Sequence, residues 1–538
     1  MKYYITRKLK ILCLASAFIT IASMGSVIYQ NIKYSSNIAN SLSPIEQVTG
    51  SFEPSTGNLY GGIYSLDGVP MLQCIDLLTG ENIMGKKSNG DAQLYCATQK
   101  YFAPVIGYDY SAENLADSIS CGMLSEKEIQ DILLSNALYS NRKAVQGNSI
   151  VTTIYSLAQE EAIKQLEGLA GQENGDIGLG SIAVVNADGA ILVNASSVSD
   201  NQLEFQNRNE DYITNPKDEP IYYTTNNNAF QAAAVGSSFK PLTARILEHN
   251  DELFSDNWSV FNSDFDDQSA VTIKGLYIAN WEMISNVDPT YYYTSFDGNV
   301  YHRSSDLKLA FINSSNTYFL RHANELGLNK YQKLLNEDLH LYDKYSIGGF
   351  TLDGLVPYID GKFESEDAYS VNLPYGNTAI LSPVRLASAY NHALSGNFYL
   401  PFEIAQICDP SGSVVFQYQP QERKEYKLDV DVSNDIVDDG LKSTFQSYVT
   451  KNDGTYDAIF DEFSYDLLSS GRLLSKSGTA GVDSDHENRT MALTLLNEDK
   501  SNVICTAVIS VNNCQENSIS NMALIYKLLK VIDKLGVY

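Results

Sequence analysis

Basic residues are scarce in this sequence, and their scarcity limits the partners that the protein can bind. The 538 residues include 37 Lys and Arg against 65 Asp and Glu, which gives a net charge of −28 at pH 7. A surface this acidic repels a phosphate backbone, so nucleic acid is a poor candidate partner. Hydrophobic residues make up 44% of the chain and charged residues 19%, which argues against disorder on a large scale.

Cysteine and histidine are few and scattered, which argues against metal chemistry. The seven cysteines form no C-x-x-C pair, and the six histidines form no H-E-x-x-H or similar cluster. Zinc sites are built from such spacings, so we expect neither a metal nor another cofactor. Apart from Cys13, the cysteines could form disulfides, but their spacing does not determine a pairing.

Long hydrophobic runs are also rare, because the sequence contains a single one. Residues 11–29 carry no charge, and the preceding residues 1–10 carry four basic side chains and no acid. Nineteen residues of helix reach roughly 28 Å, about the thickness of the hydrocarbon core. This pattern predicts a cytoplasmic basic tail, a single-pass transmembrane anchor in the cell membrane, and a large extracytoplasmic portion. A cleaved signal peptide is the alternative, because small residues stand near the end of the run.

Beyond the anchor, composition and periodicity divide the chain in two. Residues 30–147 begin with a tether rich in Ser, Asn and Pro and continue with apolar runs separated by Asp-Gly and Thr-Gly turns, which predict hairpins in a small N-terminal module. Residues 148–538 begin with a strand, a helix and a hairpin at 180–197, continue through a largely helical middle, and end in strands and a last helix. This order predicts an α+β domain whose sheet is closed by distant segments. The stretch 251–299, rich in Tyr, Asp and Asn, has the composition of an insertion or elaborated loop.

Two helices carry clear local signals. Ser382, Pro383 and Gly396 stand at the N-cap, the first helical position and the position past the end of one predicted helix. In the helix that follows residue 148, apolar residues recur with helical spacing at Leu157, Ala158, Ala162, Ile163 and Leu166.

The first motif that could carry chemistry is Ser237-Ser-Phe-Lys240, at the start of a predicted helix. Its spacing places both side chains on one helix face. A serine hydroxyl is a poor nucleophile until a base takes its proton, and a lysine whose pKa is lowered can be that base. The motif is weak by itself, because the same spacing recurs at Ser140 and Ser305. The simpler interpretation of an isolated Ser-x-x-Lys is a serine that caps a helix and a lysine on the protein surface.

Two further motifs add weight to the first. Residues 314–316, Ser-Ser-Asn, open a predicted helix, and residues 476–479, Lys-Ser-Gly-Thr, lie on a predicted strand near the C-terminus. Gly478 would let a substrate backbone approach this strand, although an exposed edge strand with a glycine kink is the structural alternative. By chance, all three motifs occur together in this order far more rarely than any one of them occurs alone.

With these motifs, the chain resembles the class B, monofunctional penicillin-binding protein transpeptidases, which are related to the serine β-lactamases. The stretches "VGSSFKPLTA", "NSSNTYFLRHANELG" and "GNTAILSPVRLASAYNHALSGN" carry the resemblance. It implies an antiparallel sheet flanked by helices plus an all-helical subdomain over residues 148–538. A pedestal-like or dimerisation-like module at 30–147 and one transmembrane helix would precede this domain. We find no glycosyltransferase-like region.

The resemblance implies a role for each motif residue. Ser237 would attack the carbonyl between two D-alanines of a peptidoglycan stem peptide, and Lys240 would accept its proton. Ser314 would relay a proton to the departing amine, while Asn316 would hold Lys240 and the substrate amide. Lys476 would supply positive charge that keeps Lys240 neutral.

The same resemblance implies the binding groups and partners. Ser477, Gly478 and Thr479 would bind the substrate, and the backbone N–H groups of Ser237 and Thr479 would form the oxyanion hole. A β-lactam would mimic the donor peptide and stall as an acyl-enzyme. A membrane glycosyltransferase of cell-wall synthesis is the partner that the family suggests. Val235 departs from the family, which usually has proline there.

Two other functions remain open at the level of sequence. Water could replace the acceptor amine, which would make the protein a D,D-carboxypeptidase or a β-lactamase. Alternatively, the fold could serve as a non-catalytic scaffold or β-lactam sensor. The complete set of motif residues argues against the loss of chemistry, and the anchor with its large N-terminal module argues against a β-lactamase.

Overall fold

The computed structural model describes most of the chain beyond residue 148 and a few segments before it. The described residues are 63–69, 71–76, 94–98, 102, 105, 149–170, 179–197, 227–254, 265–280, 293–297, 300–347, 350–409, 412–430, 435–450, 462–483, 485–515 and 518–537. The predicted anchor at 11–29 lies outside these residues. Within them, no helix is both long and apolar enough to cross a membrane.

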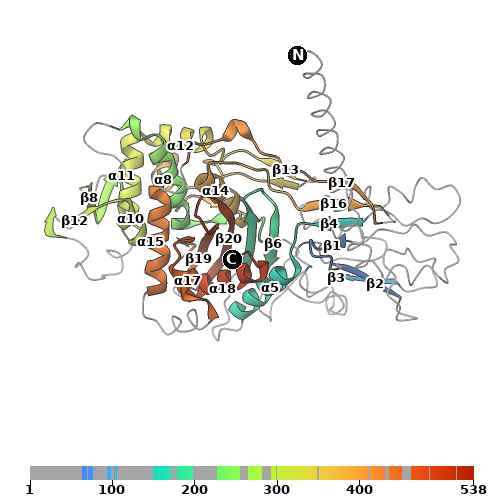
Figure 1. Ribbon diagram of the computed structural model, residues 1–538. Coiled ribbons are helices and arrows are strands. Elements are labelled where there is room, and N and C mark those ends of the chain that lie inside the picture. Colours follow the sequence, from blue (N-terminus) through green and yellow to red (C-terminus); the bar gives the residue numbers. More distant parts are fainter. Residues whose placement is uncertain are drawn as a thin grey trace, which may run out of the picture.

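A five-stranded antiparallel sheet forms the centre of the molecule, with the strand order β18-β19-β20-β5-β6. Figure 1 shows the early strands β5 and β6 beside the late strands β19 and β20, as predicted for a sheet closed by distant segments. The strands are β5 (Leu179–Asn186), β6 (Ile191–Ser196), β18 (Leu473–Gly481), β19 (His486–Leu496) and β20 (Val503–Gln515). The α+β prediction is therefore confirmed.

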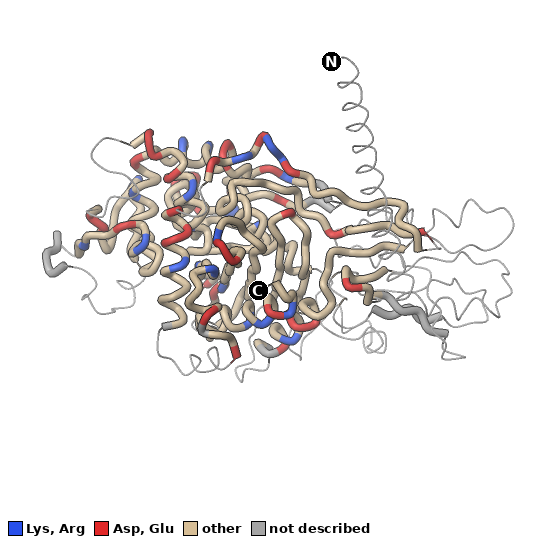
Figure 2. Tube along the Cα trace, in the orientation of Figure 1, with Lys and Arg blue, Asp and Glu red and all other residues tan. Residues whose placement is uncertain are grey.

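Helices cover both faces of this sheet because its side chains alternate between two hydrophobic cores. In β5, Ile182 and Val184 face α5 (Ser156–Ala170) and α18 (Asn521–Leu535), whereas Ala183 and Val185 belong to the core that contains α14 (Pro383–Ser395). Figure 2 shows few charges along the central strands, and β5, β6 and β20 contain none.

The two helix predictions have different outcomes. Ser382 accepts a hydrogen bond from the backbone N–H of Arg385, and Gly396 ends α14 in the left-handed conformation, which confirms both caps. In α5, Leu157 is 54% exposed, so its predicted place on the apolar face is wrong; a leucine exposed singly is common on protein surfaces. The remaining members of that predicted face, Ala158, Ala162, Ile163 and Leu166, are buried.

Beside the sheet lies a second subdomain, which the sequence predicted to be all-helical. Its helices are α8 (Lys240–His249), α10 (Leu307–Ile312), α11 (Asn316–Leu326), α12 (Leu328–Glu337), α13 (Glu366–Asn372) and α15 (Ile436–Thr450). The prediction is wrong in one respect, because this region also holds two small sheets, β11-β12-β8 and β10-β9. Their strands are β8 (Phe265–Gln268), β9 (Ala270–Ile273), β10 (Leu276–Ala279), β11 (Tyr293–Asp297) and β12 (Val300–Ser305). Each strand is only four to six residues long, and β8 and β12 carry charged residues, so the alternation that identifies strands from sequence is too short to detect.

A third group of strands joins the N-terminal segments to the main domain. β1 pairs in parallel with β4, and the sheet continues as β1-β4-β16-β17, while β2 pairs with β3. The Asp67 carboxylate accepts the backbone N–H of Ser156 at the start of α5, which adds a side-chain link. The bounds are β1 (Ile63–Tyr64), β2 (Leu72–Asp76), β3 (Leu94–Thr98), β4 (Ser149–Thr152), β16 (Ile404–Cys408) and β17 (Val414–Gln417). The short elements elsewhere are β7 (Ala233–Ala234), β13 (Tyr345–Ile347), β14 (Phe350–Leu352), β15 (Ile380–Leu381) and α17 (Tyr465–Ser469).

A buried cluster of charges joins α8 to the start of α15. The fully buried Arg245 donates from Nη1 to Asp435 Oδ2 at 2.7 Å, and Asp435 also accepts the backbone N–H groups of Val437 and Asp438. The Asp438 carboxyl group lies 4.0 Å from Arg245 Nη2, and its oxygens find no hydrogen-bond partner among the described residues. Burial, and then repulsion by Asp435, raises the pKa of Asp438 well above its usual value.

We expect Asp438→Asn to stabilise the protein at pH 8. A carboxyl group whose pKa is raised by folding favours the folded state only while it is protonated, and this contribution is lost as the pH rises through the folded-state pKa. The amide carries no charge, so at high pH it avoids the free-energy cost of burying an ionised carboxylate beside Asp435. Melting temperatures measured at pH 4 and pH 8 should therefore show a larger gain at pH 8. The control is Asp439→Asn, whose carboxylate is 78% exposed, and an equal gain in both variants would contradict the prediction.

Candidate active site

Ser237 lies in a short 3₁₀ helix, η3 (Gly236–Phe239), that leads directly into α8. No side chain caps η3 or α8, so Ser237 is not the N-cap that the simpler interpretation required. Its hydroxyl instead accepts a hydrogen bond of 2.9 Å from Lys240 Nζ. Lys240 is fully buried. The nucleophile and base predicted from the first motif are therefore in direct contact.

Ser314 lies in the turn between α10 and α11, where two lysines meet on its hydroxyl. Lys240 Nζ and Lys476 Nζ each lie 3.0 Å from Ser314 Oγ, and Lys240 also donates to the Ser314 carbonyl at 2.6 Å. Ser314 has a φ of 51°, in the left-handed region that costs a non-glycine residue free energy. The turn thus holds a strained backbone in a position where its side chain bridges two cationic groups.

Asn316, the first residue of α11, completes the surroundings of Lys240. Its Oδ1 accepts from Lys240 Nζ at 2.8 Å, and its Nδ2 donates to the Ala279 carbonyl at 3.2 Å. An amide has one acceptor end and one donor end, so the carbonyl of Ala279 determines that the oxygen faces the lysine.

Lys476 is the only charged residue of strand β18 and is fully buried. Burial lowers its pKa, against an opposing effect of Tyr448. Two ammonium groups on one hydroxyl oxygen repel each other, which favours a state in which one lysine is neutral. Such a lysine can take the proton of Ser237.

Strand β18 packs backbone to backbone against η3. A Cβ atom placed on Gly478 would lie 2.0 Å from the Val235 carbonyl oxygen, and one placed on Gly236, whose φ is +55°, would lie 2.3 Å from the Thr479 carbonyl oxygen. Only glycine fits at these two positions. The packing brings residues 478–479 beside Ser237, and it leaves Thr479 exposed and Ser477 half-buried.

Tyr448, on α15, is a site residue that the sequence analysis missed. Its hydroxyl lies 2.7 Å from Ser477 Oγ and accepts the Ser477 backbone N–H at 3.3 Å. Burial raises the pKa of Tyr448, but the nearby Lys476 and the hydrogen bonds with Ser477 outweigh it, so the pKa is lowered. Tyr448 belongs to no motif and lies 29 residues before Ser477, so no sequence signal marks it.

The described residues thus bring together side chains from all three motifs: Ser237, Lys240, Ser314, Asn316 and Lys476. Ser477, Gly478 and Thr479 lie on the adjoining strand. Within the same described ranges, no group of three His, Cys, Asp or Glu side chains could hold a metal ion. A buried lysine, a serine and a second hydroxyl in mutual contact can carry out nucleophilic attack with proton transfer.

Comparisons with known proteins agree with this geometry. Residues 180–529 match the family model described as the penicillin binding protein transpeptidase domain. No curated protein sequence matches the chain.

Solved structures show the same fold at low sequence identity. The D,D-transpeptidase domain of a peptidoglycan glycosyltransferase from Eggerthella lenta is 18% identical, with a TM-score of 0.62 over 89% of this chain and 98% of that one. Penicillin-binding protein A from Mycobacterium tuberculosis, as an imipenem acyl-enzyme complex, is 14% identical, with a TM-score of 0.63 over 89% and 98%. Penicillin-binding protein 3 from the same organism, complexed with aztreonam, is 16% identical, with a TM-score of 0.60 over 90% and 97%.

We expect Gly478→Ala to separate β18 from η3. The added methyl group cannot fit against the Val235 carbonyl, and overpacking of this kind costs about 1–3 kcal/mol. Thermal unfolding and a crystal structure of the variant should show a lower melting temperature and a displaced strand. Gly481→Ala is the matched control, because nothing lies within 4 Å of its Cβ position in the same strand. Equal melting temperatures for the two variants would refute the close packing.

Proposed function

Because this chain belongs to the penicillin-binding protein transpeptidase family, we propose that it is a class B D,D-transpeptidase that cross-links peptidoglycan stem peptides through an acyl-enzyme on Ser237. The observation that carries the proposal is the buried Lys240, which contacts Ser237 and also reaches Ser314 and Asn316. The acyl-enzyme complex of penicillin-binding protein A supports the same chemistry for β-lactams.

In the acylation step, neutral Lys240 takes the proton of Ser237 as Oγ forms a bond to the carbonyl carbon between the two D-alanines. The C–N bond then breaks, and the departing amine takes a proton from the Ser314 hydroxyl. Lys240 returns a proton to Ser314 across the 3.0 Å contact between their side chains. All protons are therefore accounted for, and the lysine ends the step neutral.

The charge that develops on the substrate carbonyl oxygen also needs donors. The backbone N–H groups of Ser237 and Thr479 serve as the oxyanion hole, and each such donor contributes about 3 kcal/mol to transition-state stabilisation. The close packing of Gly478 against Val235 supports this assignment, because it brings the two backbone segments together. Lys476, Ser477 and Thr479 bind the terminal carboxylate.

The second step transfers the acyl group to an amine. The amine of a neighbouring stem peptide attacks the ester carbonyl and gives a proton to Ser314, which passes one to Lys240. Lys240 then protonates Ser237 Oγ as the ester C–O bond breaks, and Ser237 is released. A β-lactam acylates Ser237 in the same way, but its cleaved amide nitrogen stays tethered to the acyl group. Because the leaving group cannot diffuse away, the adduct persists.

The location of the reaction is part of the proposal. Residues 11–29 anchor the protein in the cell membrane, residues 30–147 form a non-catalytic module, and residues 148–538 act on the extracytoplasmic side. The uncharged run and its basic flank support the anchor. A membrane glycosyltransferase would supply the glycan strands whose peptides are joined.

Fluorescent penicillin should label the wild-type protein and fail to label Ser237→Ala, because this variant lacks the Oγ that contacts Lys240 and forms the acyl ester. Ser238→Ala is the matched control: the Ser238 hydroxyl donates to the Val235 carbonyl, so this variant should keep the label. Gel fluorescence of the folded proteins gives the readout.

Two outcomes would contradict the proposal. Rapid loss of the label with turnover of the drug would indicate a hydrolase, and a folded wild-type protein that takes no label would indicate a scaffold without chemistry.

A further inference from the structure

The stretch that resembled an insertion in the sequence holds the start of helix α11. Asn280, buried directly after β10, accepts the backbone N–H of Asn316 at 2.6 Å and that of Thr317 at 3.2 Å, both through Oδ1. The first N–H groups of a helix lack partners within the helix. Asn280 therefore caps α11 from a separate segment of the chain.

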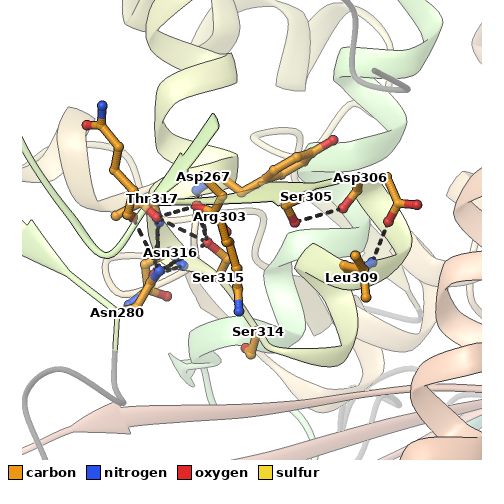
Figure 3. A network of polar contacts seen from close by, with 12 residues as sticks. Asp267, Asn280, Arg303, Ser305, Asp306, Leu309, Ser314, Ser315, Asn316 and Thr317 are labelled. Atoms are coloured by element: carbon orange, nitrogen blue, oxygen red, sulfur yellow. Dashed lines mark hydrogen bonds and ion pairs between the residues drawn. The ribbon is translucent and has the colours of Figure 1, made fainter. Parts of the chain in front are cut away.

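A chain of hydrogen bonds orients the amide of Asn280. Its Nδ2 lies 3.0 Å from Thr317 Oγ1, and the Thr317 hydroxyl donates to Asp267 Oδ1 at 2.7 Å. Since a hydroxyl has one proton and Asp267 takes it, Thr317 can only accept from Asn280. The oxygen of Asn280 is thereby turned toward α11, as Figure 3 shows.

Asp267 is held in turn by an ion pair between neighbouring strands. Its Oδ2 accepts from Arg303 Nε at 3.2 Å and Nη2 at 3.0 Å, and its Oδ1 also accepts the Ser315 hydroxyl at 3.0 Å. Asp267 is fully buried and Arg303 is 6% exposed. A buried carboxylate needs donors and a positive charge to replace the water that it has lost. Because Arg303 and the hydroxyl groups supply them, Asp267 is held in one position.

Residues 279 and 280 together hold Asn316 at two points. The Ala279 carbonyl accepts from the side-chain Nδ2, and the Asn280 side chain accepts from the backbone N–H. With both points held, Asn316 Oδ1 faces Lys240 at 2.8 Å. Neither Ala279 nor Asn280 belongs to a motif.

We propose that Asn280 is a positioning residue for acylation, which acts by placing Asn316 against Lys240. The inference rests on the proposed function, because Lys240 must be the base for this placement to affect the rate. A purely structural role would change the melting temperature without changing the rate constant of the folded protein.

The test measures the first-order acylation constant at saturating fluorescent penicillin, together with the melting temperature. Asn280→Ala should lower the constant about 10- to 100-fold, since a small misplacement near reacting groups has effects of this size. Thr317→Val, which keeps the shape but removes the hydroxyl that orients Asn280, should lower it about fivefold.

Ser269→Ala is the matched control, in the bend between β8 and β9. Its hydroxyl accepts the Tyr301 backbone N–H at 2.9 Å, so it stabilises the link to β12 and not the start of α11. It should lower the melting temperature and leave the acylation constant unchanged.

A double-mutant cycle tests whether Asn280 acts through Asn316. In an Asn316→Ala background, the further change Asn280→Ala should have almost no effect on acylation. An unchanged constant in Asn280→Ala, or the same fold-loss in both backgrounds, would overturn this inference while the wild type still takes the label. An unlabelled wild-type protein would overturn the proposed function and this inference together.

Discussion

The burial of the Lys240 amine is the constraint on which the site depends. An ammonium group removed from water must find acceptors, and those of Lys240 come from the Ser237 hydroxyl, from both oxygens of Ser314 and from the amide of Asn316. These acceptors belong to two segments that are far apart in sequence. The Lys240 amine therefore has its hydrogen-bond acceptors only when both segments are in their folded positions. Folding of these segments and assembly of the reactive geometry thus depend on each other.

Strand β18 adds the second half of the site by backbone contact. Gly236 and Gly478 bring two backbones closer than any other residue type allows, and Lys476 reaches Ser314 from the same strand. The sheet gives this strand a rigid position, because β18 pairs with β19 over its whole length. The small sheets around Asp267 support Asn316, which contacts Lys240, through side-chain hydrogen bonds.

The sequence was sufficient to predict the α+β class, the cross-sheet closure, the caps of α14 and the family, because these follow from periodicity, cap residues and short motifs. It was insufficient for features that depend on tertiary contacts, such as the exposure of a side chain or its place in the site. Leu157 keeps the helical spacing of its buried neighbours yet faces solvent. Asn280 and Tyr448 reach the site through contacts between distant segments, and neither has a local pattern that distinguishes it from other polar residues of a loop or helix.

The strand order of the central sheet has a consequence for biosynthesis. Val184 in β5 pairs with Ala507 in β20, so the hairpin β5–β6 leaves the ribosome long before its partner strand exists. Pairing between such distant segments is slow and leaves an open strand edge until it is complete. The nascent chain therefore exposes this edge over most of its synthesis, and a chain that stops after the third motif would keep every reactive side chain but lack β19 and β20, the two strands that join β18 to β5.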